Sequence, residues 1–265
     1  MSSLVIVSVV FLTAGTVLSA DYDNDSGDGL WDTATNWSDE LVPATSDVRI
    51  GNNSAIDQTC TIGSGIVGLA SRVRIGEDGN ACTLIIDGGS LTTVGDDVRV
   101  GYSTSVGTSG TLNLLWGNMT VGKDLEIGQN GEGTFTMTTG TVLVDDDIVI
   151  GTGAAGVFNL NGGTVTQTAI YEGNGFLDIG ATGLLNFGGT GLGTMVLWGD
   201  QVSTVEAYFD NGYITSDLGF IATDLTSNPG YTTVSPTAVP EPATIGLFAV
   251  FGGALMFVRR IRSRA

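Results

Sequence analysis

The chain alternates apolar with other residues over short stretches between residues 47 and 190, and one of these stretches recurs six times. Every copy ends in glycine, and successive terminal glycines are 23 to 29 residues apart. The copies are DVRIG (47–51), RVRIG (72–76), DVRVG (97–101), DLEIG (124–128), DIVIG (147–151) and FLDIG (176–180). Alternation is the period of a β-strand, so each copy predicts a short strand with one apolar face.

A second alternating stretch lies between these copies, and a Gly-Gly, Trp-Gly or Thr-Gly pair interrupts it where the chain must turn. Its examples are TLIIDGGSLTTV (83–94), TLNLLWGNMTV (111–121), TFTMTTGTVLV (134–144), VFNLNGGTVTQ (157–167) and, more loosely, LLNFGGTGL (184–192). Each unit of about 25 residues therefore predicts three short strands, and such units in sequence predict the coils of a β-solenoid stacked about 4.8 Å apart.

The predicted fold is an all-β, right-handed β-helix of about six coils, flanked by an N-terminal signal helix and a C-terminal transmembrane helix. One coil cannot bury its apolar face alone, whereas a stack of coils can. The residues expected to face inward are Val48, Ile50, Val73, Ile75, Val98, Val100, Leu125, Ile127, Ile148, Ile150, Leu177 and Ile179. A β-sandwich is the alternative, and the solenoid is favoured because sandwich strands need not share a repeat.

The segments on either side of the repeats differ from them. Residues 21–46 carry Trp31 and Trp37, and residues 191–231 carry several aromatic residues and a weaker repeat. Since the open end of a solenoid is an unpaired edge, we expect an N-terminal cap and a C-terminal β cap around the repeats at 47–190. For Trp31 and Trp37, the alternative to a cap role is a platform that stacks against sugars.

Both ends of the chain are apolar. Residues 1–20 predict a secretory signal peptide with small residues at its end, although no Lys or Arg precedes the apolar stretch. Residues 232–242 predict a linker, and residues 243–265 predict a transmembrane helix followed by arginines that stay cytoplasmic. The protein is therefore expected to be exported and anchored, at least transiently, in the inner membrane.

The order Val-Pro-Glu-Pro, apolar helix, Arg-Arg-x-Arg closely resembles the PEP-CTERM sorting signal of exported bacterial proteins. An unrelated membrane anchor is the alternative. The repeats at 47–190 are similar to the β-solenoid repeats of PEP-CTERM proteins and autotransporter passenger domains. The resemblance implies an exosortase as processing partner and a place in the cell envelope or extracellular matrix, with exopolysaccharide or biofilm association. It implies a processing motif at Pro240, Glu241 and Pro242, and a stop signal at Arg259, Arg260 and Arg262.

Composition narrows the function further. The chain has 28 acidic and 9 basic residues, which disfavours nucleic acid as a partner because phosphate binding needs clustered Lys and Arg. It has no histidine, which removes the Ser-His-Asp triad and His-based metal sites. Hydrolysis by paired carboxylates remains open. We therefore expect a non-enzymatic protein, with a carbohydrate-active enzyme or a glycan-binding adhesin on a β-helix as the alternative.

Two motifs invite a cofactor or metal. GTGAAG (151–156) matches the dinucleotide fingerprint, but another strand pattern follows it where a helix is required, so it predicts a turn and no cofactor. Asp21, Asp23, Asp25 and Asp32 have the spacing of a calcium loop, with Ser26 in the glycine position. A solvated acidic segment is favoured there, and weak Ca²⁺ binding is the alternative.

Three further groups recur from coil to coil. The aspartates at 96–97 and 145–147 precede the recurring strand, and they are interpreted as exposed turn residues or as a cation-binding ladder. Arg49, Arg74 and Arg99 occupy the same outward position in three successive copies of the strand. Because stacked arginines repel one another, we expect each to pair with a turn aspartate such as Asp47 or Asp97. The alternative is a basic strip that contacts an acidic polysaccharide, made of Arg49, Arg74 and Arg99.

Two cysteines open similar stretches in adjacent units. If Cys60 and Cys82 stack in neighbouring coils, their Cα atoms lie about 5 Å apart, within disulfide range. A disulfide and a pair of small inward-facing thiols are equally compatible with the sequence.

Overall fold

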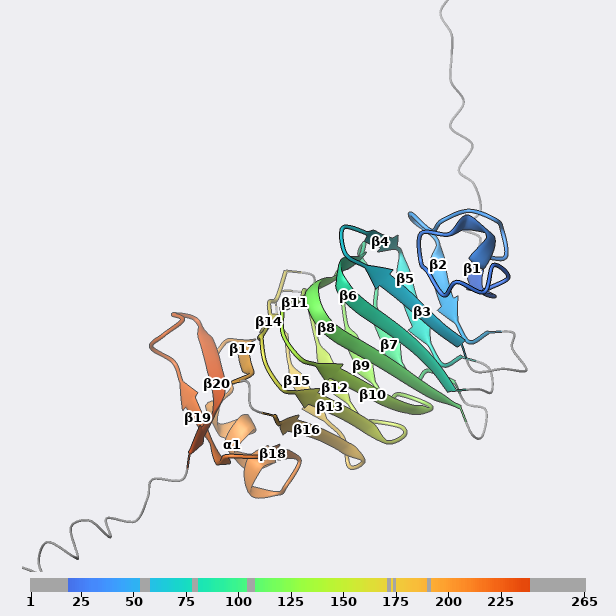
Figure 1. The fold of residues 1–265 in the computed structure, drawn as a ribbon. Helices are drawn as coiled ribbons and strands as arrows, with labels where there is room; N and C mark the ends of the chain where they lie inside the picture. The colour runs from blue at the N-terminus through green and yellow to red at the C-terminus, as the bar shows by residue number, and fades with distance from the viewer. Residues whose placement is uncertain are drawn as a thin grey trace, which may run out of the picture.

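The computed structural model is a β-solenoid capped at both ends (Figure 1), and it describes residues 19–52, 58–77, 81–103, 108–170, 173, 175–189 and 192–238. Most of the predicted signal peptide, all of the predicted processing motif and the predicted transmembrane segment lie outside these residues. Among the described residues, no helix combines the length and apolar character that crossing a membrane requires.

One long side of the solenoid is a seven-stranded parallel sheet, to which each coil contributes the recurring stretch. Its strands in order are β1 (Ser19–Tyr22), β2 (Asp47–Ile50), β5 (Arg72–Ile75), β7 (Val98–Val100), β9 (Leu125–Ile127), β12 (Ile148–Ile150) and β15 (Leu177–Ile179). The repeats predict about six coils. The additional one comes from β1, which includes the last two residues of the predicted signal peptide.

The rest of the solenoid is a 13-stranded sheet that is parallel through the repeats and turns antiparallel at β17, β20 and β19. Two of its strands, β6 and β8, run for 13 residues and take part in both halves of this sheet. Its members are β3 (Gln58–Gly63), β4 (Val67–Ala70), β6 (Ala81–Thr93), β8 (Ser109–Val121), β10 (Glu132–Met137), β11 (Thr141–Val144), β13 (Gly156–Leu160), β14 (Thr164–Gln167), β16 (Gly183–Phe187), β17 (Thr194–Trp198), β18 (Ile214–Ser216), β19 (Gly219–Asp224) and β20 (Tyr231–Ala238).

The core is made of apolar rows that run along the solenoid, one residue per coil. All twelve residues predicted to face inward are buried, with at most 4% of any of them exposed. On the opposite sheet, Phe135 stacks on Phe158 of the next coil, with ring centroids 4.5 Å apart. Alternation within each strand and identical register between coils together build this continuous core.

The glycine that ends the recurring strand is needed for two reasons, which Gly101 illustrates. Its φ is +76°, a conformation that favours glycine, and a Cβ there would lie 2.4 Å from the carbonyl oxygen of Glu132 in the next coil. The chain therefore turns sharply where neighbouring coils touch backbone to backbone.

The N-terminal end of the solenoid is covered by aromatic side chains. Trp31 and Trp37 are buried, and Tyr22 packs edge-on against Trp37. The 3-10 helix η1 (Ala34–Asn36) positions Trp37, whose indole N–H donates to the carbonyl of Trp31 at 2.8 Å. The segment therefore closes the first coil.

The C-terminal end differs from the expected β cap. It contains a helix, α1 (Val202–Asp210), which contacts β18. The hydroxyl of Tyr208 in this helix accepts a hydrogen bond from the N–H of Ile179, which lies in β15, the last strand of the seven-stranded sheet. The predicted linker at 232–242 begins as strand β20, which extends to Ala238. Pro236 is compatible with this strand because it pairs with β19 alone, beyond the end of β17.

Candidate functional site

Charged residues gather on the outer surface of the seven-stranded sheet. Register places one outward residue of each successive strand in a single row: Asp21, Arg49, Arg74, Arg99 and Glu126. Three arginines in a row would repel, so each must find a carboxylate.

The arginines are paired as the sequence predicted. Arg74 Nη2 lies 2.8 Å from Asp47 Oδ2, and Arg99 Nη2 lies 2.6 Å from Asp97 Oδ2. Arg49 Nε lies 2.7 Å from Asp21 Oδ1. These pairs neutralise the row and favour the pairing expected from the sequence, whereas contact of Arg49, Arg74 and Arg99 with an acidic polysaccharide stays a prediction.

Two further side chains belong to this network and were missed from the sequence. Arg72, in the neighbouring row, bonds Asp96 through two nitrogens. Tyr102 follows the terminal glycine of β7, and its ring centroid lies 5.2 Å from Arg74 Cζ and 5.0 Å from Arg99 Cζ. The guanidinium groups are thus held by carboxylates and by an aromatic face.

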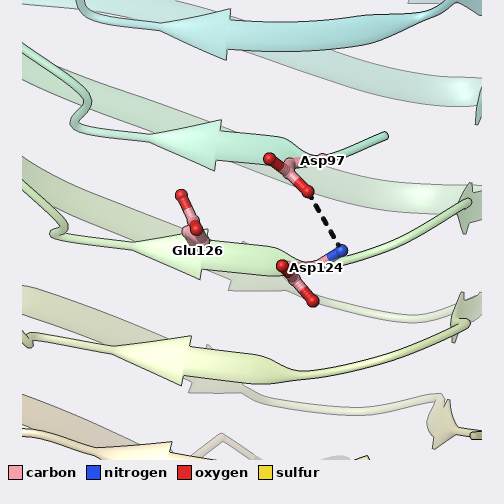
Figure 2. A group of neighbouring side chains, drawn as sticks. All are labelled: Asp97, Asp124 and Glu126. Carbon is pink, nitrogen blue, oxygen red and sulfur yellow. Dashed lines mark hydrogen bonds between the residues drawn. The ribbon is translucent and has the colours of Figure 1, made fainter. Parts of the chain in front are cut away.

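Aspartates immediately before the recurring strands form a hydrogen-bonded ladder. Asp97 Oδ1 accepts the Asp124 N–H at 3.4 Å (Figure 2), and Asp124 Oδ1 accepts the Asp147 N–H at 3.1 Å. Asp147 Oδ1 accepts the Phe176 N–H at 2.7 Å. Each carboxylate therefore satisfies a backbone donor of the next coil at the point where the chain enters the sheet.

The interpretation of these residues as exposed turn aspartates is wrong for Asp97 and Asp146, which are 1% and 4% exposed. An isolated surface turn faces water, whereas a turn in a solenoid is stacked between the turns of the two neighbouring coils. The stacking buries the side chain and gives it backbone partners.

The densest part of this surface is a group of three carboxylates, Asp97, Asp124 and Glu126, whose oxygen atoms lie within 4.8 Å of one another. A second group of the same kind consists of Asp124, Asp146 and Asp147. Figure 2 shows Glu126 projecting from β9 beside Asp97 at the start of the strand above. The sequence offered one signal for it, since DLEIG carries an acid where the three preceding copies carry arginine.

Burial changes the acidity of this group. Burial raises the pKa of Glu126 to about 7, against the opposing effect of the Arg99 charge. Burial also raises the pKa of Asp97, which again Arg99 opposes. Glu126 Oε2 lies 2.7 Å from Arg99 Nε, in contact as an ion pair but outside hydrogen-bond geometry.

Carboxylate oxygens are the ligands that Ca²⁺ prefers, but this group already has other partners. Arg99 lies between Asp97 and Glu126, and Lys123 Nζ lies 3.2 Å from Asp124 Oδ2. Backbone N–H groups take further acceptor positions. The arrangement is a charge-compensated network that joins coils.

The four aspartates of the predicted calcium loop do not all converge on one point in the structure. Asp21 pairs with Arg49, whereas Asp23 and Asp25 line a cavity of about 410 Å³ together with Glu40. Asp32 is exposed, and neither carboxylate group found among the described residues includes any of these four. Weak Ca²⁺ binding at Asp21, Asp23, Asp25 and Asp32 stays a prediction.

The sugar-stacking alternative for Trp31 and Trp37 is wrong, because the two side chains are 0% and 1% exposed. Their rings pack edge-on, with centroids 4.9 Å apart. Both ring faces are therefore taken up by the core.

In the described part of the chain, Cys60 and Cys82 are buried thiols, not a disulfide. Cys60 pairs with Leu84, and Cys82 pairs with Gln58. The expectation that the cysteines stack is wrong because their register is offset by two residues. Burial raises the pKa of the Cys60 thiol well above its usual range.

The GTGAAG motif is a solenoid turn, as predicted. Gly151 follows β12, and strand β13 begins at Gly156. No helix begins within these described residues, so no helix N-terminus is present to hold a phosphate.

Comparison of the chain with protein-family models, with curated proteins and with solved structures found no match. Function is therefore inferred from the fold, the network on the seven-stranded sheet and the sequence of the tail.

Proposed function

We propose that this protein is an exported, non-enzymatic β-solenoid of the cell envelope or extracellular matrix. The observation that carries the proposal is the order of elements at its C-terminal end. The last strand ends at Ala238, and the processing motif, apolar segment and arginines follow from Val239 to Arg262. A capped body is thus followed at once by a segment that resembles a sorting signal, which an exosortase would process.

The finer features of the fold belong to this proposal as well. We expect right-handed coils, because parallel strands are almost always joined with that hand. We also expect a signal helix before the body and a transmembrane helix, with a cytoplasmic C-terminus, after it. Since Ser19 and Ala20 form half of β1, signal cleavage that keeps the first coil intact falls before Ser19.

The charged surface supports a structural role. Its arginines and carboxylates are partners of one another, and the Asp97 and Glu126 side chains are only 2% and 10% exposed. A substrate would have to displace ion pairs that join successive coils. The remaining acidic surface is suited to solvation in a matrix rich in ions and exopolysaccharide.

The test is the mass and fractionation of the mature protein in its native host. A C-terminus near Pro242, with the product released or attached to envelope material, is expected. Glu241→Ala is expected to leave the tail intact, whereas Glu206→Ala, at an exposed glutamate on α1, is the matched control and is processed normally. An intact tail in the wild type would exclude exosortase sorting and leave an ordinary anchored solenoid.

A carbohydrate-active enzyme is the second candidate, and one observation favours it. Glu126 has a pKa of about 7 and lies beside Asp97 and Asp124, and a raised carboxyl pKa is what a general acid needs. Release of reducing ends from neutral and acidic polysaccharides, abolished by Glu126→Gln, would establish this candidate. Absence of turnover by the wild type would exclude it for those substrates.

A further inference from the structure

Trp116 is an exposed tryptophan at the bend of β8, where the corresponding turns of other coils carry glycine or threonine. Its exposed fraction is 48%, whereas Trp31 and Trp37 are buried. Trp198 is also exposed, at 40%, but its ring meets the ring of Tyr231 edge-on. Trp116 is thus a large apolar surface without a role in the core.

The indole ring is fixed in place by the preceding coil. A Cβ on Gly88 would lie 2.1 Å from Trp116 Cζ2 and 2.4 Å from Cη2, so the ring lies directly on the glycine backbone. The indole N–H donates to Asp87 Oδ1 at 2.6 Å. One side of the ring therefore rests on Gly88, and the hydrogen bond sets its orientation before any ligand arrives.

Two threonines of the next coil lie at the backbone positions beside the bend of β8. Leu114 pairs with Met137 and Asn118 pairs with Thr141, which places Thr138 and Thr139 beside Leu115 and Trp116 in the next coil. Both threonines are exposed, as is Asp87. The bend around Trp116 therefore carries one exposed carboxylate and two exposed hydroxyl side chains.

We propose that Trp116 and Asp87 form a binding site for a neutral saccharide. A sugar ring has an apolar C–H face that suits the electron-rich face of an indole, and hydroxyls at its rim that suit a carboxylate and threonines. Because the ring is already oriented, little ordering is needed on binding. The net charge of −19 and Asp87 itself disfavour anionic glycans and nucleic acids.

This inference deepens the proposed function, because it rests on the protein meeting glycans outside the cell. The ligand class is neutral saccharides, and the contact residue is Trp116 in a turn and not Trp31 or Trp37. Binding is measured on purified protein and does not depend on tail processing. Sorting and binding can therefore fail separately.

The experiment is calorimetric titration of the full chain, in a detergent without a sugar headgroup, with cellohexaose, maltohexaose, laminarihexaose and chitohexaose. We expect saturable binding of at least one of them. Trp116→Ala is expected to weaken that binding about tenfold or more, and Trp116→Phe less, because a smaller ring remains. Asp87→Ala is expected to weaken it a few-fold, because the indole loses its anchor.

Trp198→Ala is the matched control, since it removes the other exposed tryptophan and is expected to bind like the wild type. Circular dichroism and thermal unfolding establish that each variant is folded. Failure of the wild type to bind any of the four oligosaccharides at millimolar concentration would overturn the proposal. So would unchanged binding by a folded Trp116→Ala variant, or binding of tetramethylammonium at Trp116 in place of the sugars, which would indicate a cation site.

Discussion

The two outer surfaces of this solenoid are built on the same coil geometry with different chemistry. The seven-stranded sheet carries guanidinium and carboxylate groups in register. The 13-stranded sheet carries a neutral ladder, in which Asn186 Nδ2 donates to Asn159 Oδ1 at 3.5 Å and Thr215 Oγ1 donates to Asn186 Oδ1 at 3.0 Å. Both surfaces join each coil to the next.

The difference shows what stacking demands of a side chain. An amide or hydroxyl both donates and accepts, so similar residues can stack without repulsion. A guanidinium only donates, so Arg49, Arg74 and Arg99 need carboxylates from adjacent rows and turns. The charged surface therefore depends on particular partners, on pH and on salt, whereas the neutral ladder does not.

Of the substitutions that test this difference between the two surfaces, removal of Arg99 is expected to lower the free energy of unfolding most. Arg99→Ala leaves the buried carboxylates of Asp97 and Glu126 without their shared cation. Breaking a buried pair on one side lowers the free energy of unfolding by about 3–4 kcal/mol. Urea unfolding near pH 8, where the carboxyls are ionised, measures the loss.

Asn159→Ala is the control on the neutral ladder, and about 1 kcal/mol or less is expected there. Equal losses for the two variants would show that the charged network is no more demanding than the amide ladder.

The contribution of Glu126 to stability can be measured separately by following unfolding as a function of pH. Its pKa in the folded protein is about 7, above its ordinary value of 4.5, so the folded state holds the proton more tightly. The contribution to stability is complete below about pH 4.5 and is lost as the pH rises to about 7. We expect a loss of roughly 2–3 kcal/mol over this range in the wild type relative to Glu126→Gln.

Thermal or urea unfolding of both proteins across the range measures this difference, in which the other carboxyl groups cancel. Parallel stability curves would show that Glu126 titrates normally.

The sequence was most informative where a single strand pattern decides the outcome. The six glycine-terminated stretches predicted the inward residues correctly, because side-chain direction in a strand follows from alternation. The prediction that Cys60 and Cys82 stack was wrong, because the register between coils depends on turn lengths that differ from unit to unit. The group around Glu126 was missed because it combines residues of two coils at a junction between turn and strand. The exposed Trp116 was visible as a substitution in a turn, but its support by Gly88 required the register.

The neutral ladder is expected to tolerate loss of one member at a moderate cost. Asn186→Ala removes two hydrogen bonds, to Asn159 and from Thr215, and lowers the free energy of unfolding by about 1 kcal/mol. The loss should be the same at low and high salt, since neither bond involves an ion. Unfolding of the wild type and the variant in about 0.05 M and about 1 M salt measures both the size of the loss and its dependence on salt. A salt-dependent loss would contradict the assignment of this surface as neutral.

The smallest effect is expected at the first ion pair of the charged row. Arg49 and Asp21 keep 26% and 23% of their side chains exposed, so Arg49→Ala lowers the free energy of unfolding by less than about 1 kcal/mol. The wild type itself is expected to gain stability from salt, because a net charge of −19 repels itself less when screened. The informative quantity is therefore the difference between Arg49→Ala and wild type, which should shrink as salt rises. If that difference stays constant, Arg49 acts through packing of its aliphatic stem and not through its charge.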